Sequence, residues 1–168
     1  DGTLVPSRRL PEDGSGRRVG GVRIESLPTP TSRVEVDIVD AATGRPTPAR
    51  VRFQAPDGRY LPPLGHRDEV NPGLNEDNGA DVVLGGTTYA YVPGRFPIVL
   101  PNGPVDIEVV HGFDHRPMRR TIDVGDGREP LVLAVEPIDD GGWTAVDCHV
   151  HFISPTSALL QARAEGVA

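Results

Sequence analysis

Three residues near the C-terminal end of the sequence have the types and the spacing of a metal site. Asp147, His149 and His151 alternate along "GWTAVDCHVHF", residues 142–152, although the whole chain contains only 5 histidines. If this segment is a strand, alternate side chains point to one face, with the two imidazoles about 6.5–7 Å apart along the backbone. Both can then reach one divalent ion, because a Zn–N bond is about 2.0–2.1 Å long. On the same face, Asp147 would orient a ligand or bridge to a second ion.

The residues around this motif predict a strand followed by a helix. The opposite face of the strand is apolar, which is typical of a strand buried against helices; it consists of Val146, Cys148, Val150 and Phe152. In "SPTSALLQARAEG", residues 154–166, Ser154 or Thr156 can cap a helix, Pro155 suits its first turn and Gly166 is a natural stop. We expect a further strand to begin at the last two residues.

The middle of the chain has the alternation of short strands. "RVEVDIVD", residues 33–40, places valine and isoleucine on one face and charged residues on the other. Similar segments, separated by turns rich in Gly and Pro, occur at 49–54, 81–84, 87–92, 95–100, 105–110, 118–124 and 130–136. About eight such strands predict a mainly β protein, an antiparallel immunoglobulin-like sandwich over residues 33–137. The 20 glycines and 18 prolines also favour many turns and few helices.

The sandwich is expected to carry an extension at each end. Residues 1–32 alternate Pro, Gly, Ser and charge and have too few apolar residues to fold alone. They form either a linker with an edge strand at "VRIES" or an extended arm that pairs with the sheet of a neighbouring subunit. Residues 138–168 form the other extension: a linker, the motif strand and the helix.

A long loop at residues 61–80 collects oxygen-bearing side chains. Asp77, Asn78 and Asp81 are a candidate calcium-type cation site, since such ions prefer carboxylate and amide oxygens. The spacing matches no EF-hand loop, so a ligand-facing contact loop and a solvated acidic loop stay open alternatives. His66 is expected to be an exposed loop histidine.

A second pair of histidines lies at "HGFDHRP", around Asp114. His111 and His115 are four residues apart, a spacing that can grip a metal on a helix. However, Gly112 and Pro117 disfavour a helix here, so we predict a hairpin corner.

Composition excludes several classes of function. The formal net charge is −7, with 17 Lys and Arg against 24 Asp and Glu, so the clustered cations of a nucleic-acid binder are absent. No apolar run is long enough for a transmembrane segment. Aromatic residues make up 5%, which disfavours a carbohydrate-binding face. Cys148 is the single cysteine, so no internal disulfide forms. Because the sequence starts at Asp1, we expect a secreted or periplasmic protein with its export signal removed, although a partial cytoplasmic sequence would start similarly.

These features together resemble the N-terminal region of metal-dependent hydrolases of the polymerase-and-histidinol-phosphatase (PHP) type, in the carbaryl-hydrolase-like branch. The segments "DAATGRPTPARVRFQAPDG" and "YAYVPGRFPIVLPNGPVDIEVVHGFDHRPMRRTIDV" are similar to a carboxypeptidase-regulatory-like sandwich module. They precede the Gly-Trp junction and the Asp-x-His-x-His motif in the order found in that branch. The resemblance covers about residues 33–168.

The resemblance implies that His149 and His151 are metal ligands on the first strand of a catalytic barrel. Later strands of such barrels add His, Asp and Glu ligands, and two or three divalent ions of the zinc or manganese class activate a water. Two imidazoles are fewer than the three protein ligands of a typical catalytic zinc. We therefore expect no complete set of catalytic residues and no activity in this chain alone, and a C-terminal catalytic domain as its missing partner.

The alternative is a non-catalytic sandwich module that assembles with copies of itself. Exchange of the terminal extensions between copies would give homo-oligomers, and head-to-tail contacts that do not close would give filaments. Under this hypothesis no cofactor is needed, and the two histidines lie in an ordinary packed strand.

Overall fold

The computed structural model describes the backbone of residues 17–19 and 22–24 and, in full, residues 30–70, 79–125, 129–139 and 141–167. The chain divides into two compact units, Asp1–Pro30 and Thr31–Ala168. In the first unit, β1 (Arg17–Val19) pairs antiparallel with β2 (Val22–Ile24). The strand expected at "VRIES" therefore has its partner within the same unit.

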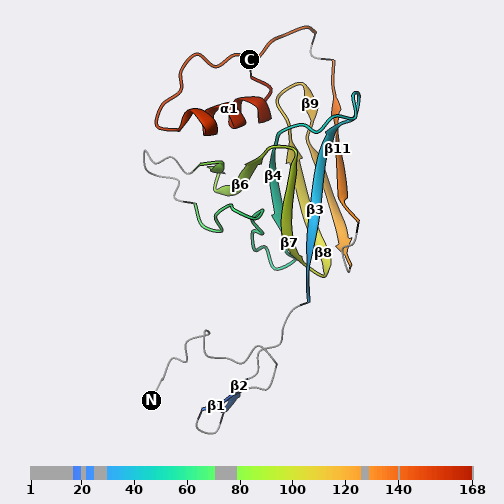
Figure 1. Ribbon diagram of the computed structural model, residues 1–168, viewed down its shortest axis with the longest axis vertical. Helices are drawn as coiled ribbons and strands as arrows, with labels where there is room; N and C mark the ends of the chain where they lie inside the picture. The colour runs from blue at the N-terminus through green and yellow to red at the C-terminus, as the bar shows by residue number, and fades with distance from the viewer. Residues whose placement is uncertain are drawn as a thin grey trace. The chain divides into compact units, whose positions relative to one another are not determined.

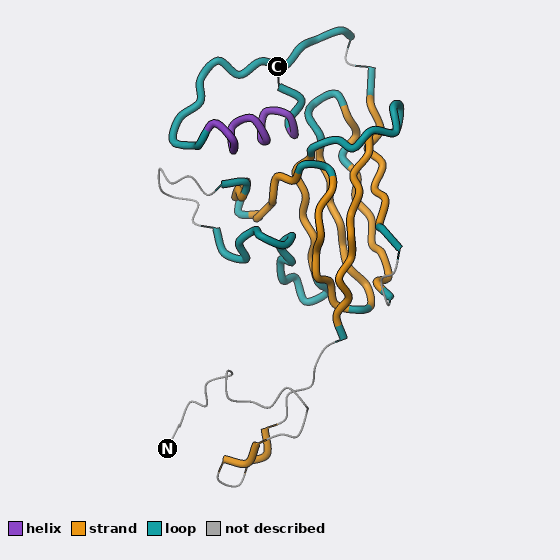
Figure 2. The backbone as a smooth tube through the Cα atoms, viewed as in Figure 1, coloured by secondary structure: helices purple, strands orange, loops and turns teal. Residues whose placement is uncertain are grey.

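The second unit is a sandwich of two β-sheets, with a helix at one end (Figures 1 and 2). This confirms the mainly β sandwich predicted from the sequence. One sheet has the strand order β10-β8-β4-β6-β5 and the other β7-β3-β11-β9. The strands are β3 (Thr31–Asp40), β4 (Ala49–Gln54), β5 (Asp81–Leu84), β6 (Thr87–Val92), β7 (Arg95–Pro101), β8 (Gly103–Val110), β9 (His115–Arg116), β10 (Met118–Val124) and β11 (Leu131–Pro137).

The core lies between the two sheets and is built from alternate residues of each strand. In β3, the side chains of Val34, Val36 and Ile38 are buried while their neighbours face outward, as the sequence alternation predicts. From the facing sheets, Phe53 and Phe96 meet edge to face, with ring centroids 6.1 Å apart. Burial of these apolar side chains supplies the main stabilisation of the sandwich.

One strand pair differs from the expected antiparallel arrangement. β11 runs parallel to β3, with Leu131 opposite Val36, while the other strand pairs of the two sheets are antiparallel in the described residues. Alternation in a sequence reports which face of a strand is buried but carries no information on the direction of its neighbour. The antiparallel sandwich predicted from the sequence therefore contains one parallel pair.

The turn between β6 and β7 approaches the backbone after β3 so closely that it requires glycine. Gly94 has φ +101°, and a Cβ atom there would lie 2.9 Å from both the N and the O of Thr47. The carbonyl of Gly94 accepts a hydrogen bond of 2.6 Å from the backbone N–H of Ile38. This contact holds the turn between β6 and β7 against the end of β3 and the chain that leads into β4.

The helix after the motif forms as predicted. α1 (Pro155–Ala164) begins at the N-cap Ser154, whose hydroxyl accepts a hydrogen bond of 3.2 Å from the N–H of Ser157. Beyond the helix, Gly166 adopts φ +63°, the left-handed conformation of a helix stop. Among the described residues, no helix is long and apolar enough to cross a membrane.

The strand predicted for residues 143–152 does not form. Ala145 makes an isolated parallel bridge to Val167, and the rest of this segment has no strand partner among the described residues. The predicted apolar face is exposed rather than buried; its members are Val146, Cys148, Val150 and Phe152. An alternating sequence needs a neighbouring strand for its N–H and C=O groups and a layer to cover its apolar face. Apart from the bridge at Ala145, the described chain supplies neither for this segment.

Candidate metal centre

The two histidines of the motif lie side by side although their backbone is irregular. The ring centroids of His149 and His151 are 4.3 Å apart, with the ring planes at 64° to each other. Both residues are exposed, and with Asp147 they line an open hollow of about 770 Å³ that α1 also borders. The structure thus brings the three predicted site residues to one hollow, on an irregular segment rather than on the face of a strand.

Local hydrogen bonding and backbone conformation shape this irregular segment. The Asp147 carboxylate accepts a hydrogen bond of 2.9 Å from the backbone N–H of His149. Phe152 adopts φ +61°, an uncommon conformation for a bulky residue, and its ring lies 5.3 Å from that of His151. A carboxylate has about four lone-pair positions, so Asp147 keeps acceptor capacity for a further partner.

The wall of the hollow is fixed by an ion pair between the sandwich and the end of α1. Arg50 Nε lies 2.7 Å from Glu165 Oε1, and the hydroxyl of Tyr91 donates to the same oxygen at 2.9 Å. Burial, and then the negative charge of Glu165, raise the pKa of Tyr91, so its hydroxyl stays protonated and able to donate. One turn earlier in the helix, the side-chain amide of Gln161 donates to the carbonyl of Gly79.

A second cluster, which the sequence predicted only as a hairpin corner, lies on the turn between β8 and β9. His111, Asp114 and His115 can each offer a ligand atom such that these atoms lie within 4.8 Å of one another. The corner itself is present, but its histidines also pack together, with ring centroids 4.5 Å apart at 82°. The spacing of the three residues was the available signal; the partners that orient them come from distant segments.

Three of the four ring nitrogens of His111 and His115 have a partner. Two of these partners come from distant segments, and the third is Asp114. His111 Nδ1 lies 2.6 Å from the carbonyl oxygen of Pro48. His115, which is buried, places Nδ1 2.8 Å from Asp114 Oδ1 and Nε2 3.2 Å from Asp40 Oδ2. Both nitrogens of one ring therefore face carboxylates.

The two carboxylates of this cluster favour their charged forms. Hydrogen bonds, the largest from the backbone of Thr43 and the next from His115, lower the pKa of Asp40. At Asp114, burial acts to raise the pKa, but the hydrogen bond from His115 and the charges of His115 and His111 outweigh it and lower the pKa overall. Negative charge is therefore concentrated around a buried imidazole.

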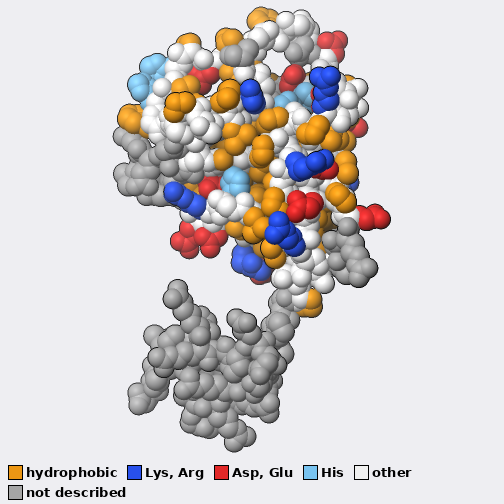
Figure 3. All heavy atoms as spheres, viewed as in Figure 1, with side chains coloured by type: hydrophobic (Ala, Val, Ile, Leu, Met, Phe, Trp, Pro, Cys, Tyr) orange, Lys and Arg blue, Asp and Glu red, His pale blue; other side chains and the backbone are white. Residues whose placement is uncertain are grey.

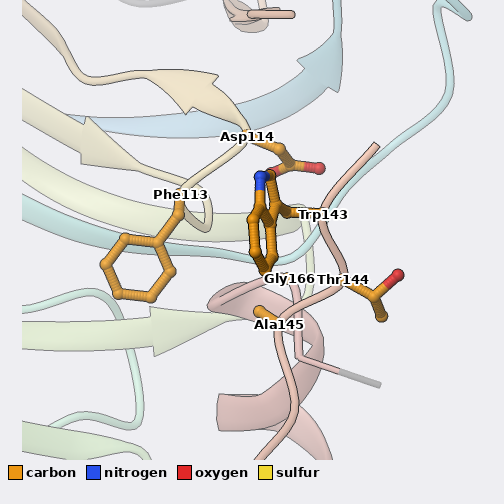
Figure 4. Close-up of a pocket in the computed structure, with 6 residues that line it drawn as sticks. All are labelled: Phe113, Asp114, Trp143, Thr144, Ala145 and Gly166. Carbon is orange, nitrogen blue, oxygen red and sulfur yellow. The ribbon is translucent and has the colours of Figure 1, made fainter. Parts of the chain in front are cut away.

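Asp114 also opens onto a hollow of about 370 Å³ beside the C-terminal segment. Figure 4 shows its carboxylate next to the indole of Trp143, with Phe113 across the hollow. The Asp114 side chain is 45% exposed, and Trp143 is 85% exposed. Solvent and ions can reach the cluster from this side.

The candidate cation site in the long loop is described only at Asp81. Its two carboxylate oxygens bind His66 Nδ1 at 2.7 Å and the backbone N–H of Arg67 at 3.1 Å. Asp77 and Asn78 lie outside the described residues, so this site stays a prediction. The expectation that His66 is exposed was wrong, because 15% of its side chain is accessible and its ring is held by Asp81.

The chain matches no family model and no curated protein. Among solved structures, it is similar to a streptococcal ancillary pilin, with 16% sequence identity and a TM-score of 0.41. The similarity covers 66% of this chain but only 30% of the pilin chain. A likeness this distant does not extend to function.

Proposed function

We propose that this chain is an accessory β-sandwich that carries the first metal-binding segment of a metal-dependent hydrolase of the PHP type. The observation that supports this most directly is the pair of imidazoles, His149 and His151, whose exposed rings lie 4.3 Å apart at the edge of an open hollow. Within the described residues, the ring nitrogens of this pair make no hydrogen bond, so their lone pairs are available to an ion.

The chain path after the motif supports the same proposal. Ala145 and Val167 bridge in parallel, with α1 as the connection between them. This single parallel bridge, closed by a helix, has the connectivity of the βα unit from which parallel α/β domains are built. The exposed apolar side chains of residues 146–152 are what such a domain would cover with its further strands and helices.

His149 and His151 would be the nitrogen ligands of a divalent ion of the zinc or manganese class, with Asp147 close enough to orient or bridge. When bound, such an ion supplies an activated water for hydrolysis. Because catalytic zinc typically has three protein ligands, further ligands would have to come from a domain beyond Ala168. This chain's own residues hold part of the site and fix its position against the sandwich through Glu165, Arg50 and α1.

The test is the metal content and intact mass of the protein isolated from its source. We expect a mass above that of the 168 residues and bound divalent metal, at about one equivalent or more per chain. In that protein, His149→Gln and His151→Gln should each lower hydrolytic activity by at least ~100-fold. His66→Gln is the matched control, a histidine held by an aspartate away from the hollow, and should leave activity unchanged. The proposal would be contradicted by a native protein of 168 residues whose metal content is the same with and without the two substitutions.

A second candidate function is self-assembly, and the exposed apolar surface of the C-terminal segment favours it. Trp143, Val146 and Phe152 are 85%, 75% and 63% exposed, and Leu159 of α1 is 52% exposed. Figure 3 shows hydrophobic side chains at the surface over α1 and this segment. Apolar patches of this kind mark surfaces that another chain covers. A second copy of the chain, exchanging its terminal extensions, would cover this one.

Sedimentation or light scattering separates the two candidates. Self-assembly requires a mass that grows with protein concentration and that Val146→Ser with Phe152→Ser returns to the monomer. A strictly monomeric chain contradicts self-assembly and leaves the hydrolase proposal standing. In both cases we place the protein outside the cytoplasm, in the periplasm or secreted, which fractionation of the source cells tests.

A further inference from the structure

We infer that the sandwich holds a second site, for a divalent metal of the zinc class, formed by His111, Asp114 and His115. It uses none of the residues of the proposed hydrolase site and does not depend on that proposal. The three residues are donors of the kinds zinc selects, two imidazole nitrogens and one carboxylate oxygen. Their ligand atoms already lie within 4.8 Å of one another.

His111 is oriented for metal binding by a backbone carbonyl. Its Nδ1 lies 2.6 Å from the oxygen of Pro48, and a carbonyl oxygen can only accept. Nδ1 therefore carries the proton, and Nε2 of the neutral ring carries a free lone pair. A histidine that binds a metal through one nitrogen typically donates its other N–H to a carbonyl or carboxylate. His111 has this arrangement before any ion binds.

His115 is oriented in a similar way, but by a carboxylate instead of a backbone carbonyl. Its Nε2 faces Asp40 Oδ2 at 3.2 Å, and its Nδ1 faces Asp114 Oδ1 at 2.8 Å. An ion between Nδ1 and Asp114 would bind both of them, while an N–H at Nε2 would donate to Asp40 and orient the ring.

The geometry accommodates an ion after small movements. Ligand atoms about 2.0–2.2 Å from a tetrahedral zinc lie about 3.3 Å from one another. The distance between the ligand atoms of Asp114 and His115 would therefore increase slightly, and the ligand atom of His111 would move closer to both. The Asp114 side chain, 45% exposed, can rotate into the hollow that it shares with Trp143 (Figure 4). A water from that hollow would complete the four ligands. We assign this site a structural role and no catalytic step.

An ion here would tie the corner to the chain that follows the sandwich. The N–H of Gly112 donates to the carbonyl of Ala164 at the end of α1, and the carbonyl of Asp114 accepts from the N–H of Ile138 just after β11. The ligands thus sit on a turn that contacts the C-terminal segment at two points. Metal binding should therefore stabilise the attachment of α1 as well as the turn.

The test is titration with Co²⁺, whose visible absorption reports a tetrahedral site, in a chain that lacks the other candidate ligands. We expect His149→Gln with His151→Gln to retain about one equivalent of Co²⁺, displaced by Zn²⁺. Adding Asp114→Asn or His111→Gln should weaken binding by more than ~100-fold, and Asp40→Asn, which keeps all three ligands, by about 10–100-fold. His66→Gln, which alters the other His–Asp pair, is the control and should change nothing.

A second measurement separates a metal site from a purely structural cluster. Zn²⁺ should raise the thermal unfolding midpoint of the His149→Gln, His151→Gln protein but not of its Asp114→Asn derivative, which keeps the shape of the side chain. Absence of tetrahedral Co²⁺ absorption, or absorption that Asp114→Asn leaves unchanged, would overturn the inference. If the unmodified chain binds Co²⁺ but the His149→Gln, His151→Gln protein does not, the only metal site is the proposed hydrolase site, and the inference is overturned.

Discussion

Arg50 Nε and Glu165 Oε1 lie 2.7 Å apart although 115 residues separate them in the sequence. The side chains of Arg50 and Glu165 are only 15% and 22% exposed, so the pair is largely shielded from water. It joins β4, in the sandwich, to the C-cap of α1. The position of the motif hollow relative to the sandwich depends on this contact.

Replacing Glu165 should detach α1 without unfolding the sandwich core. Glu165→Gln removes the negative partner of Arg50 and should cost about 2 kcal/mol of docking free energy, as for hydrogen bonds to charged groups. Hydrogen exchange at the α1 amides measures it. Glu35→Gln is the control, because its ion pair with Arg33 is exposed and should change stability by less than about 0.5 kcal/mol. Equal exchange at α1 in both variants would contradict the assigned role of the pair.

Replacing Gly112 by alanine should destabilise the fold more than the same replacement at Gly85, which has a similar backbone conformation. Gly112 has φ +55°, and a Cβ there would lie 2.8 Å from Asp114 Oδ1 and 3.0 Å from the carbonyl oxygen of Glu165. Gly85, at φ +57°, has open space around it. Both substitutions should cost about 1–2 kcal/mol for the left-handed conformation. Gly112→Ala should cost more in urea unfolding because of the steric overlap; a smaller cost than for Gly85→Ala would refute the close packing of this corner.

The core should respond strongly to loss of Phe53. This ring is fully buried and meets Phe96 edge to face. Phe53→Ala should lower the free energy of unfolding by about 3–5 kcal/mol through lost burial and the cavity left behind. Val132, on the outer face of β11 and 54% exposed, is the control and should change little when replaced by alanine. Comparable losses at both positions would mean that the two sheets do not face each other as described.

Acid should weaken the fold through Asp40 and Asp114. Their pKa values lie below the ordinary value of 3.8 in the folded chain. The unfolded chain therefore takes up these protons first, so the stability they contribute is present above about pH 4 and is lost as pH falls through the folded pKa values. Urea unfolding at descending pH should show a smaller loss for Asp114→Asn than for the unmodified chain. Parallel curves for both would show that Asp114 contributes nothing to this dependence.

The strands and the helix could be predicted because their signals are local. Alternation marks the core face of β3, and Ser154 and Gly166 mark the ends of α1 within a few residues. β9, with only two residues, has no periodicity and exists through its pairing with β11. The parallel direction of β11 was likewise not encoded in any single segment.

The arrangement of the two candidate sites was also hard to predict, because it too depends on contacts between distant segments. Alternation predicted a strand through His149 and His151, but a strand needs neighbours, and the described chain offers one bridge at Ala145. The corner at His111 and His115 looked ordinary because its orienting groups, on Asp40 and Pro48, lie 75 and 63 residues away from their partners. Long-range contacts of this kind become visible only in the folded chain.

The parallel neighbours β3 and β11 have a mechanical consequence. Because they are the first and last strands of the sandwich and point the same way, Thr31 and Pro137 lie at opposite ends of this pair, about 36 Å apart at 3.3 Å per residue. Tension applied between these ends would load the hydrogen bonds between the two strands in shear, all at once, instead of peeling them singly. Unfolding by force along this direction should therefore need a higher force than peeling the same hydrogen bonds one at a time.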